Sequence, residues 1–190
     1  MKRLAYLKSK KAFTLIELVV VIAIIGVLAG ILIPVIVGAV RSANVASANT
    51  SATDIRKSVN IWLTMMDAKG HTINKTQNIN NDPYITITAD RGIYDIEFSD
   101  TFWPKSENEQ ELIDSLNDHL IHNLGYHELV AIGYLHNGAI AALAYCVNVN
   151  ESTQDMPEFA DFSRTDYWTG TNGIAADGTV IGTSPQILNG

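Results

Sequence analysis

Cysteine is nearly absent from this chain of 190 residues, and the single Cys146 excludes an intrachain disulfide. A domain of this size has enough core to fold without one. We interpret Cys146 as a small buried hydrophobic residue in a strand, because a catalytic thiol would need a partner base and an exposed setting. The sequence also lacks a nucleophile constellation, a phosphate-binding glycine loop and a zinc motif, so we expect no enzymatic activity and no cofactor.

Charge is absent from Leu18 to Val40, a run of 23 residues. A membrane-spanning helix needs about 20 apolar residues. A cleaved secretory signal has an apolar run of only about 7–15 residues, followed by a small-residue cleavage site. Here the run is longer and no such site follows it, so the simplest interpretation is a retained membrane anchor.

Acidic residues are absent from the first twelve positions, which carry five basic residues: Lys2, Arg3, Lys8, Lys10 and Lys11. The rest of the chain holds all 20 acidic residues against 8 basic ones. By the positive-inside rule, we expect a single-pass membrane protein with its basic leader in the cytoplasm and its acidic part outside. An acidic surface is a poor general binder of phosphate backbones, so no direct nucleic-acid partner is expected.

Glu17 interrupts this pattern, because it places a carboxylate at the start of the apolar helix. A charged side chain at the centre of a membrane helix costs about 2.5–3.5 kcal/mol on insertion scales. A plain anchor would be better without it. Glu17 therefore indicates a partner for its charge.

The residues around Glu17, Lys10-Lys11-Ala12-Phe13-Thr14-Leu15-Ile16-Glu17-Leu18, followed by the apolar run, resemble the prepilin signature of type IV pilins and type II secretion pseudopilins. The resemblance implies that a membrane prepilin peptidase cuts between Ala12 and Phe13 and methylates the new amine of Phe13. The apolar helix is retained. Most of the family has Gly before the cut, so Ala12 is a departure that predicts slower cleavage; a defective site would leave an unprocessed membrane protein.

The same resemblance gives expected roles to three helix residues. Glu17 of one subunit would neutralise the terminal amine of its neighbour, which fixes register more than it adds stability. Gly26 and Pro34 stand where many pilins carry Gly and Pro, and imply a segment that kinks in the free subunit and melts in the filament. From the residues alone, Gly26-x-x-x-Gly30 equally fits close helix packing in a membrane.

Four regions are expected along the chain: a cleaved leader at 1–12, an apolar helix at 13–40, its amphipathic continuation at 41–69 and a soluble α+β head at 70–190. The fold class is α+β and pilin-like, with the second half of a long N-terminal helix packed on a small antiparallel sheet. The buried stripe of that half is Val45, Ala48, Ala52, Ile55, Val59, Trp62 and Met66, with polar residues such as Asn49, Asp54, Arg56 and Asn60 elsewhere on the helix. Lys69 and Gly70 predict a basic last turn and a glycine cap.

The head contains five further predicted elements. The hairpin is the clearest, because Asn137-Gly138 favours a tight turn. A capping box of Ser106 and Glu109 predicts the helix start, and Gly125 its end. The elements are strands at Tyr84–Thr88, Ile93–Phe98 and Thr179–Ile181, a helix at Ser106–Leu124, and a hairpin of Glu128–Leu135 with Ala139–Val147.

Weaker candidate sites are weighed against simpler interpretations. His119 and His122 share a helix face near His127, as metal ligands can, but a solvated helix end is the favoured reading. Carboxylates in the glycine-rich tail could hold Ca²⁺, as in the calcium loop of the major pseudopilin, although solvated acidic loops are favoured here: Asp155, Glu158, Asp161, Asp166 and Asp177. Tyr167-Trp168 is a candidate adhesive contact.

The sequence thus predicts a structural subunit of a type IV pilus. Its partners would be copies of itself and other pilins, prepilin peptidase, a membrane assembly platform, and the lipid bilayer before assembly. A pseudopilin of a secretion or competence system is one alternative. A membrane-anchored binding or enzymatic domain that never polymerises is another.

Overall fold

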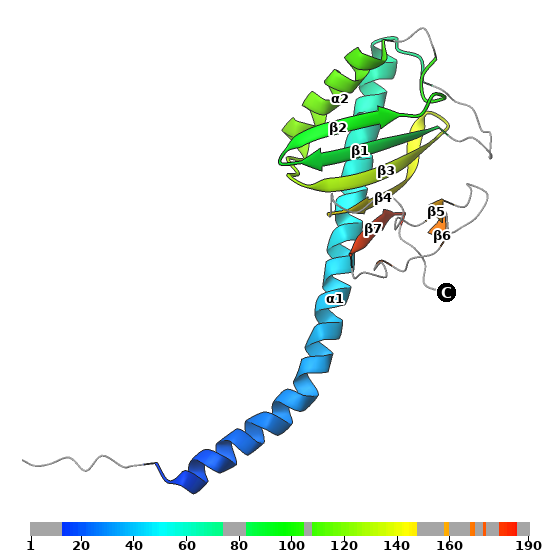
Figure 1. Cartoon of the computed structure of the whole chain (residues 1–190). Coiled ribbons are helices and arrows are strands. Elements are labelled where there is room, and N and C mark those ends of the chain that lie inside the picture. Colours follow the sequence, from blue (N-terminus) through cyan, green and yellow to red (C-terminus); the bar gives the residue numbers. More distant parts are fainter. Residues whose placement is uncertain are drawn as a thin grey trace, which may run out of the picture. The chain divides into compact units, whose positions relative to one another are not determined.

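The computed structural model describes residues 13–73, 83–104, 108–147, 158–159, 168–169, 173 and 179–185. The chain divides into two compact units, Met1–Ser42 and Ala43–Gly190. Helix α1 (Leu15–Ala68) contributes its first part to one unit and its second part to the other. With the antiparallel sheet that follows, the layout is α+β and pilin-like, as the sequence predicts (Figure 1).

The head is built on one five-stranded sheet in the order β2-β1-β3-β4-β7, with every neighbouring pair antiparallel. Both helices of this unit, the second part of α1 and α2, lie on one face of the sheet (Figure 1). The bounds are β1 (Tyr84–Asp90), β2 (Ile93–Phe98), α2 (Glu109–Asn123), β3 (Leu129–His136), β4 (Ala139–Cys146) and β7 (Ile181–Ser184). Two short strands, β5 (Glu158–Phe159) and β6 (Trp168–Thr169), pair separately.

Both tight hairpins have the backbone that type I′ turns require. In the predicted β3–β4 hairpin, Asn137 has φ of 54° and Gly138 of 81°. In the β1–β2 hairpin, Arg91 has φ of 52° and Gly92 of 81°. Two positive φ values match the right-handed twist of the strands, and glycine in the second position supplies one without strain. The sequence predicts the two strands of the second hairpin but not its turn, because arginine is an unusual residue there.

The predicted stripe of α1 forms the centre of the core. Ala48, Ala52, Ile55, Val59, Trp62 and Met66 are all buried, and Val45 is half-buried. From α2, Leu112, Leu116 and Leu120 complete the layer. An aromatic cluster closes one end: Trp62 stacks on Phe98 at 6.2 Å between ring centroids and meets Trp103 edge-on at 5.8 Å. Such pairs add about 0.5–1.5 kcal/mol beyond the area they bury.

A second stripe of α1 is polar and binds the sheet. Its members recur at spacings of three and four along one flank of the helix: Asn49, Thr53, Arg56 and Asn60. Asn60 donates to the carbonyl of Ile140 at 3.0 Å and accepts from the N–H of Ile140 at 2.6 Å. Arg56 donates to the carbonyl of Ala141 at 2.9 Å, and Asn49 accepts from the N–H of Thr183 at 2.8 Å. These residues therefore fix the helix against β4 and β7, whereas Asp54 stays exposed.

Replacing Asn60 by Ala is expected to destabilise the head by about 1–3 kcal/mol, because the buried backbone groups of Ile140 lose both partners. The measurement is thermal unfolding of the full chain in detergent, followed by near-ultraviolet circular dichroism of the aromatic cluster. Thr64→Ala is the matched control, since its hydroxyl only bonds back to the carbonyl of Asn60 on the exposed side. Equal stability of the two variants would contradict a structural role for the Asn60 pair.

Two predicted helix ends are confirmed and two details are wrong. Gly70 and Gly125 follow the helices with φ of 94° and 63°, as glycine caps do. However, α1 ends at Ala68, so Lys69 lies beyond its last turn. Helix α2 begins at Glu109 with Asn108 as its N-cap and no side-chain cap bond, so the predicted capping box with Ser106 is wrong. Ser106 itself lies outside the described residues.

The strand predicted at Thr179–Ile181 is displaced toward the C-terminus, to Ile181–Ser184. Pairing with β4 sets these bounds, from Cys146 opposite Ile181 to Leu143 opposite Ser184. This long-range pairing leaves no local pattern in the sequence. In the strand order β7 is last and forms one edge of the sheet.

Burial raises the pKa of three tyrosines of the head. Loss of solvent is the main cause at Tyr94, Tyr134 and Tyr145; at Tyr134 the neighbouring Tyr84 raises the pKa further, and at Tyr145 a hydrogen bond with Ser51 lowers it in part. A raised folded-state pKa means that stability is constant below the ordinary value of 10.0 and is lost as pH rises past it.

We expect head unfolding to be coupled to tyrosinate absorbance in an alkaline titration. Tyr145→Phe should weaken that alkaline loss, and an unchanged profile would contradict the assignment.

Candidate functional site

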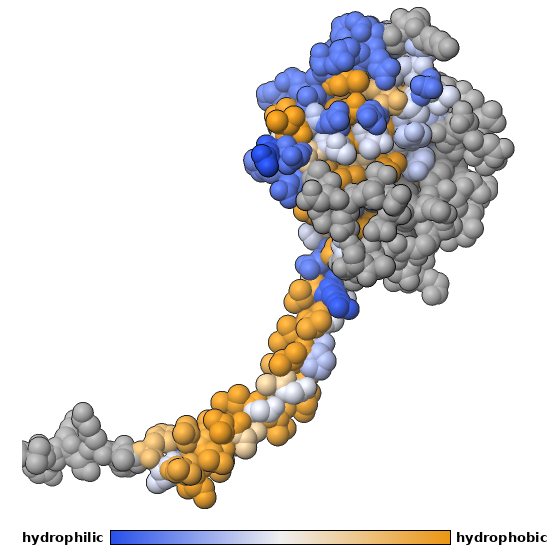
Figure 2. Space-filling view, in the orientation of Figure 1, coloured by the Kyte–Doolittle hydropathy of each residue, from blue (hydrophilic) through white to orange (hydrophobic). Residues whose placement is uncertain are grey.

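The first part of α1 is apolar on all sides and exposed. Among its side chains, Leu15 is 81% exposed, Val27 66% and Ile31 67%. Figure 2 shows the hydrophobic colouring along this part of the helix, which is the one helix of the described residues long and apolar enough to cross a membrane. Soluble proteins rarely leave such a surface uncovered. Such a surface is suited to contact with lipid or with other apolar helices.

The helix begins with a reciprocal cap between Thr14 and Glu17. The Thr14 backbone N–H donates to a carboxylate oxygen of Glu17 at 2.9 Å, and the Thr14 hydroxyl donates to the same oxygen at 2.7 Å. In return, the backbone N–H of Glu17 donates to the Thr14 hydroxyl at 3.3 Å. This is a capping box, which satisfies backbone donors that the first turn of a helix leaves unpaired.

The cap pairs hydrogen-bond donors with acceptors but does not neutralise the negative charge of Glu17. Glu17 is the only charged residue between Lys11 and Arg41. Within residues 13–73 and the other described ranges, no basic group lies within ion-pair distance of its carboxylate. An anion on a helix that belongs in lipid is costly until a cation joins it. Among the described residues, the site is therefore a hydrogen-bonded carboxylate with no basic group near it.

Gly26, Gly30 and Pro34 lie inside α1, whose helical backbone continues through all three. A Cβ added at Gly26 or Gly30 would meet nothing within 4 Å, so neither glycine makes a close packing contact with the part of the chain that the structure describes. Pro34 has no N–H for the carbonyl of Gly30, which leaves one helical bond unmade. The expected kink and melting of this segment stay predictions.

Comparison with known proteins adds one finding at this place. Residues 7–33 match the prokaryotic N-terminal methylation motif. The match supports a prepilin of the type IV pilin or pseudopilin kind, as the sequence resemblance implies. It spans Ala12, Phe13, Glu17 and Gly26, and ends one residue before Pro34. No curated protein and no solved structure matches the chain.

The structure places the residues singled out from sequence as follows. Ala12 lies outside the described residues, and Phe13 is 77% exposed beside Glu17. Phe13, Ile16, Glu17, Val20 and Val21 line one shallow hollow on the helix. Thr14 was missed as a functional residue. The spacing of Thr and Glu three apart before an apolar run is the sequence signal that identifies it.

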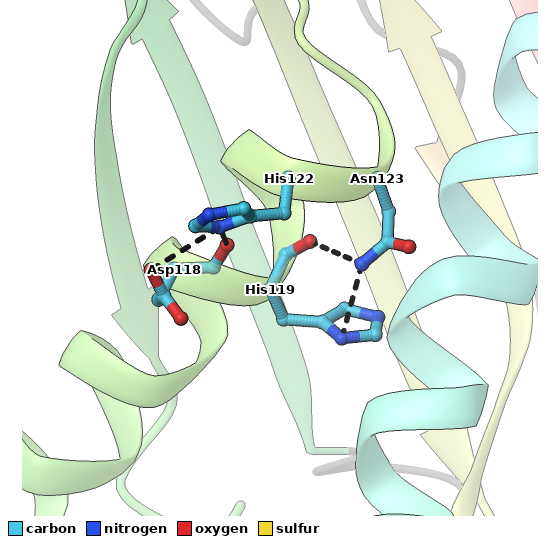
Figure 3. Close-up of polar contacts among 4 residues, drawn as sticks. All are labelled: Asp118, His119, His122 and Asn123. Carbon is cyan, nitrogen blue, oxygen red and sulfur yellow. Dashed lines mark hydrogen bonds and ion pairs between the residues drawn. The ribbon is translucent and has the colours of Figure 1, made fainter.

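Within the described residues, the histidines of α2 have separate partners. His119 reaches α1, where its Nε2 lies 3.0 Å from the carbonyl oxygen of Ser58, and its Nδ1 lies 3.3 Å from the amide of Asn123. His122 instead pairs with Asp118, with its Nδ1 3.2 Å from a carboxylate oxygen. Figure 3 shows the two rings apart, each with its own partners. Across the described ranges no group of three potential ligands could hold a metal ion.

The remaining candidate residues, Cys146 and those of the tail, do not add a second site among the described residues. Cys146 is buried in β4, as predicted. Glu158 lies in β5 and Trp168 in β6, and the other tail candidates lie outside the described residues: Asp155, Asp161, Asp166, Tyr167 and Asp177. The start of α1 is therefore the candidate functional site.

Proposed function

We propose that the chain is a structural subunit of a type IV pilus. In this proposal prepilin peptidase removes residues 1–12, the helix at 13–40 holds the subunit in the membrane, and the head faces outward. Subunits then leave the bilayer and bury their apolar helices against one another in a filament. The leader, helix and head keep the boundaries expected from sequence, with 41–69 as the link and 70–190 as the head.

One observation carries the proposal. Glu17 is held by its capping bonds at the start of an exposed apolar helix, with no basic group near it among residues 13–73, and within a stretch that matches the methylation motif. Cleavage before Phe13 creates an amine four residues away along the chain. A carboxylate and an amine that are both poorly solvated attract each other strongly, and pairing across two subunits would set their axial register.

The other residues of the site have supporting roles. Gly26 weakens the helix because it has no side chain to pack. Pro34 weakens it because it has no backbone N–H to donate. This supports a segment that changes conformation on assembly. Partners in this scheme are copies of the chain and other pilins, prepilin peptidase, an assembly platform in the membrane, and lipid before assembly.

Mass spectrometry of native cells tests the proposal. We expect a peptide that begins at Phe13 and carries one added methyl group, in material sheared from the cell surface. The same peptide confined to membranes would favour a pseudopilin. A chain that still begins at Met1 in all fractions would overturn the proposed processing and favour an anchored domain that does not polymerise.

An Ala12→Gly variant is the internal control for the cut. The change removes one methyl group beside the scissile bond and leaves Phe13 in place. If Ala12 slows cleavage, the variant accumulates less full-length precursor than the natural chain during a pulse-chase. Equal rates would mean that Ala12 is processed as readily as glycine.

A further inference from the structure

A patch on the outer side of α1 and α2 combines exposed apolar side chains with exposed carboxylates. The helices are antiparallel, because His119 of α2 meets Ser58 of α1 and Ser115 meets Trp62, with the indole N–H 3.1 Å from the serine hydroxyl. Continuing this register places Glu111 opposite Met66, so the adjacent Met65 lies at about the same level of the two helices. The two helices thus form one continuous surface.

The apolar part of the patch comes from α1. Ile61 is 58% exposed and Met65 is 41% exposed, one helical turn apart, while their neighbours Trp62 and Leu63 are buried. Positions four apart lie on the same face of a helix. Two large apolar side chains of α1 thus face outward, next to the stripe of α1 that is buried in the core.

The charged part comes from α2, whose residues 109–123 contain four acidic residues and no Lys or Arg. Glu111 and Asp118 stand four before and three after Ser115, so they share the side of α2 that faces α1. Among the described residues, the only ion pair of these carboxylates joins Asp118 to His122. On α1, Lys57 is the nearest base in sequence to Ile61. The patch is therefore an apolar strip with acidic residues on its α2 side, and Lys57, four residues before Ile61 on the same face of α1, is a base at one end of it.

The β1–β2 turn is the chemical complement of this patch. The Arg91 side chain is 89% exposed, and its one recorded ion pair, with Asp90 at 3.8 Å, is weak in solvent. Two residues later, Ile93 is 75% exposed. An exposed cation in the turn and an exposed branched aliphatic side chain at the start of β2 therefore lie two residues apart. This turn lies beyond the C-terminal end of α2, where the N–H of Gly92 donates to the carbonyl of His127.

We propose that the β1–β2 turn of one copy docks on the α1–α2 patch of a second copy. Arg91 would meet Glu111 and Asp118, and Ile93 would cover Ile61 and Met65. The proposal rests on the proposed filament function and names its contact between heads. Because the two surfaces are different parts of one molecule, the contact is heterologous, and such contacts continue into open assemblies unless a rotation closes them.

Charge reversal in the full chain, in native cells, tests the contact. Arg91→Asp keeps a residue that tolerates the left-handed backbone, and Asp118→Lys places a cation in the second half of α2, where the helix dipole favours it. Each variant alone should reduce the sheared surface fraction, and the two changes in one chain should restore it. Loss in both single variants without restoration would overturn the pairing, as would no loss in either.

Matched variants separate the contact from folding. Glu97→Lys reverses an exposed carboxylate of β2 that shares the sheet face of Ile93 but lies four residues along the strand from it, outside the proposed pairing, and should leave assembly unchanged. Arg91→Asn removes the charge but suits the turn, so it should weaken assembly at normal membrane levels of the chain. If the membrane level of a variant falls together with its assembly, the variant has a folding defect. In that case the test of the contact is whether the double charge-reversal variant restores assembly.

Cross-linking distinguishes this contact from failure of the filament itself. Two tagged chains, both with Cys146→Ser, carry Arg91→Cys in one and Asp118→Cys in the other. A bifunctional maleimide should link the two chains to each other, and neither chain to itself when expressed alone. Self-linking alone would indicate a symmetric contact and overturn the proposal. If the chain never appeared in the sheared fraction, the proposed filament function would be wrong. The presence or absence of the cross-link in membranes would still show whether the two heads make the proposed contact.

Discussion

Glu17→Gln is expected to abolish filaments while the processed chain accumulates in the membrane. The cap itself tolerates the change, because glutamine can accept the same bond from the Thr14 backbone. Only the negative charge is lost. Removing one partner of a buried ion pair costs about 3–5 kcal/mol, which corresponds to a reduction in assembly of more than roughly a hundredfold.

The comparison of Glu17→Gln with Glu17→Ala separates charge from capping. Ala removes both, and Gln removes charge alone. If the carboxylate acts on a neighbouring amine, both variants lose sheared filaments, measured by immunoblot against the membrane fraction. Filaments of normal yield from the Gln variant would mean that Glu17 serves its own helix, and the proposed pairing would be abandoned.

Gly182→Ala is expected to have the largest effect on the head. A Cβ at this position would overlap the carbonyl of Ala48 and stand 2.7 Å from the backbone nitrogen of Asn49. These are backbone atoms of α1, which cannot move aside as a side chain end can. Overpacking of a close contact costs about 1–3 kcal/mol and sometimes more, so β7 should separate from the helix in part.

Thermal unfolding of the full chain in detergent measures this effect. Gly133→Ala is the matched control, because its Cβ would meet methyl groups of Ile140 and Ile85 at 3.1 and 3.2 Å, and side chains can give way by a few tenths of an ångström. We expect a clearly larger fall in melting temperature for Gly182→Ala. The reverse order would show that β7 does not depend on its approach to α1.

The sequence predicts the helices and the paired strands of the head well, because their signals are local. The stripe from Ala48 to Met66 repeats with the period of a helix, and Asn137-Gly138 is itself a turn signal. The resemblance around Glu17 likewise depends on a few adjacent residues, and the motif match agrees with it.

What the sequence did not reveal depends on contacts between distant residues. Asn49 and Asn60 look like surface residues in a helical pattern, and only the folded chain brings them to Thr183 and Ile140, more than 75 positions away. Gly182 likewise looks like a loop glycine until β7 lies against Ala48. The start of α2 was misplaced because Ser106 and Glu109 fit a cap by spacing, while the chain uses Asn108.

The polar flank of α1 recognises main-chain atoms almost exclusively. Asn49, Arg56 and Asn60 bond to the backbone of Thr183, Ala141 and Ile140, and only Thr53 meets a side chain, the hydroxyl of Ser184. Every amino acid except proline offers the same backbone groups. The side chains on the outer face of these strands are therefore free to diverge without loosening the helix. A head built this way can change its outer surface while the part that carries it stays the same.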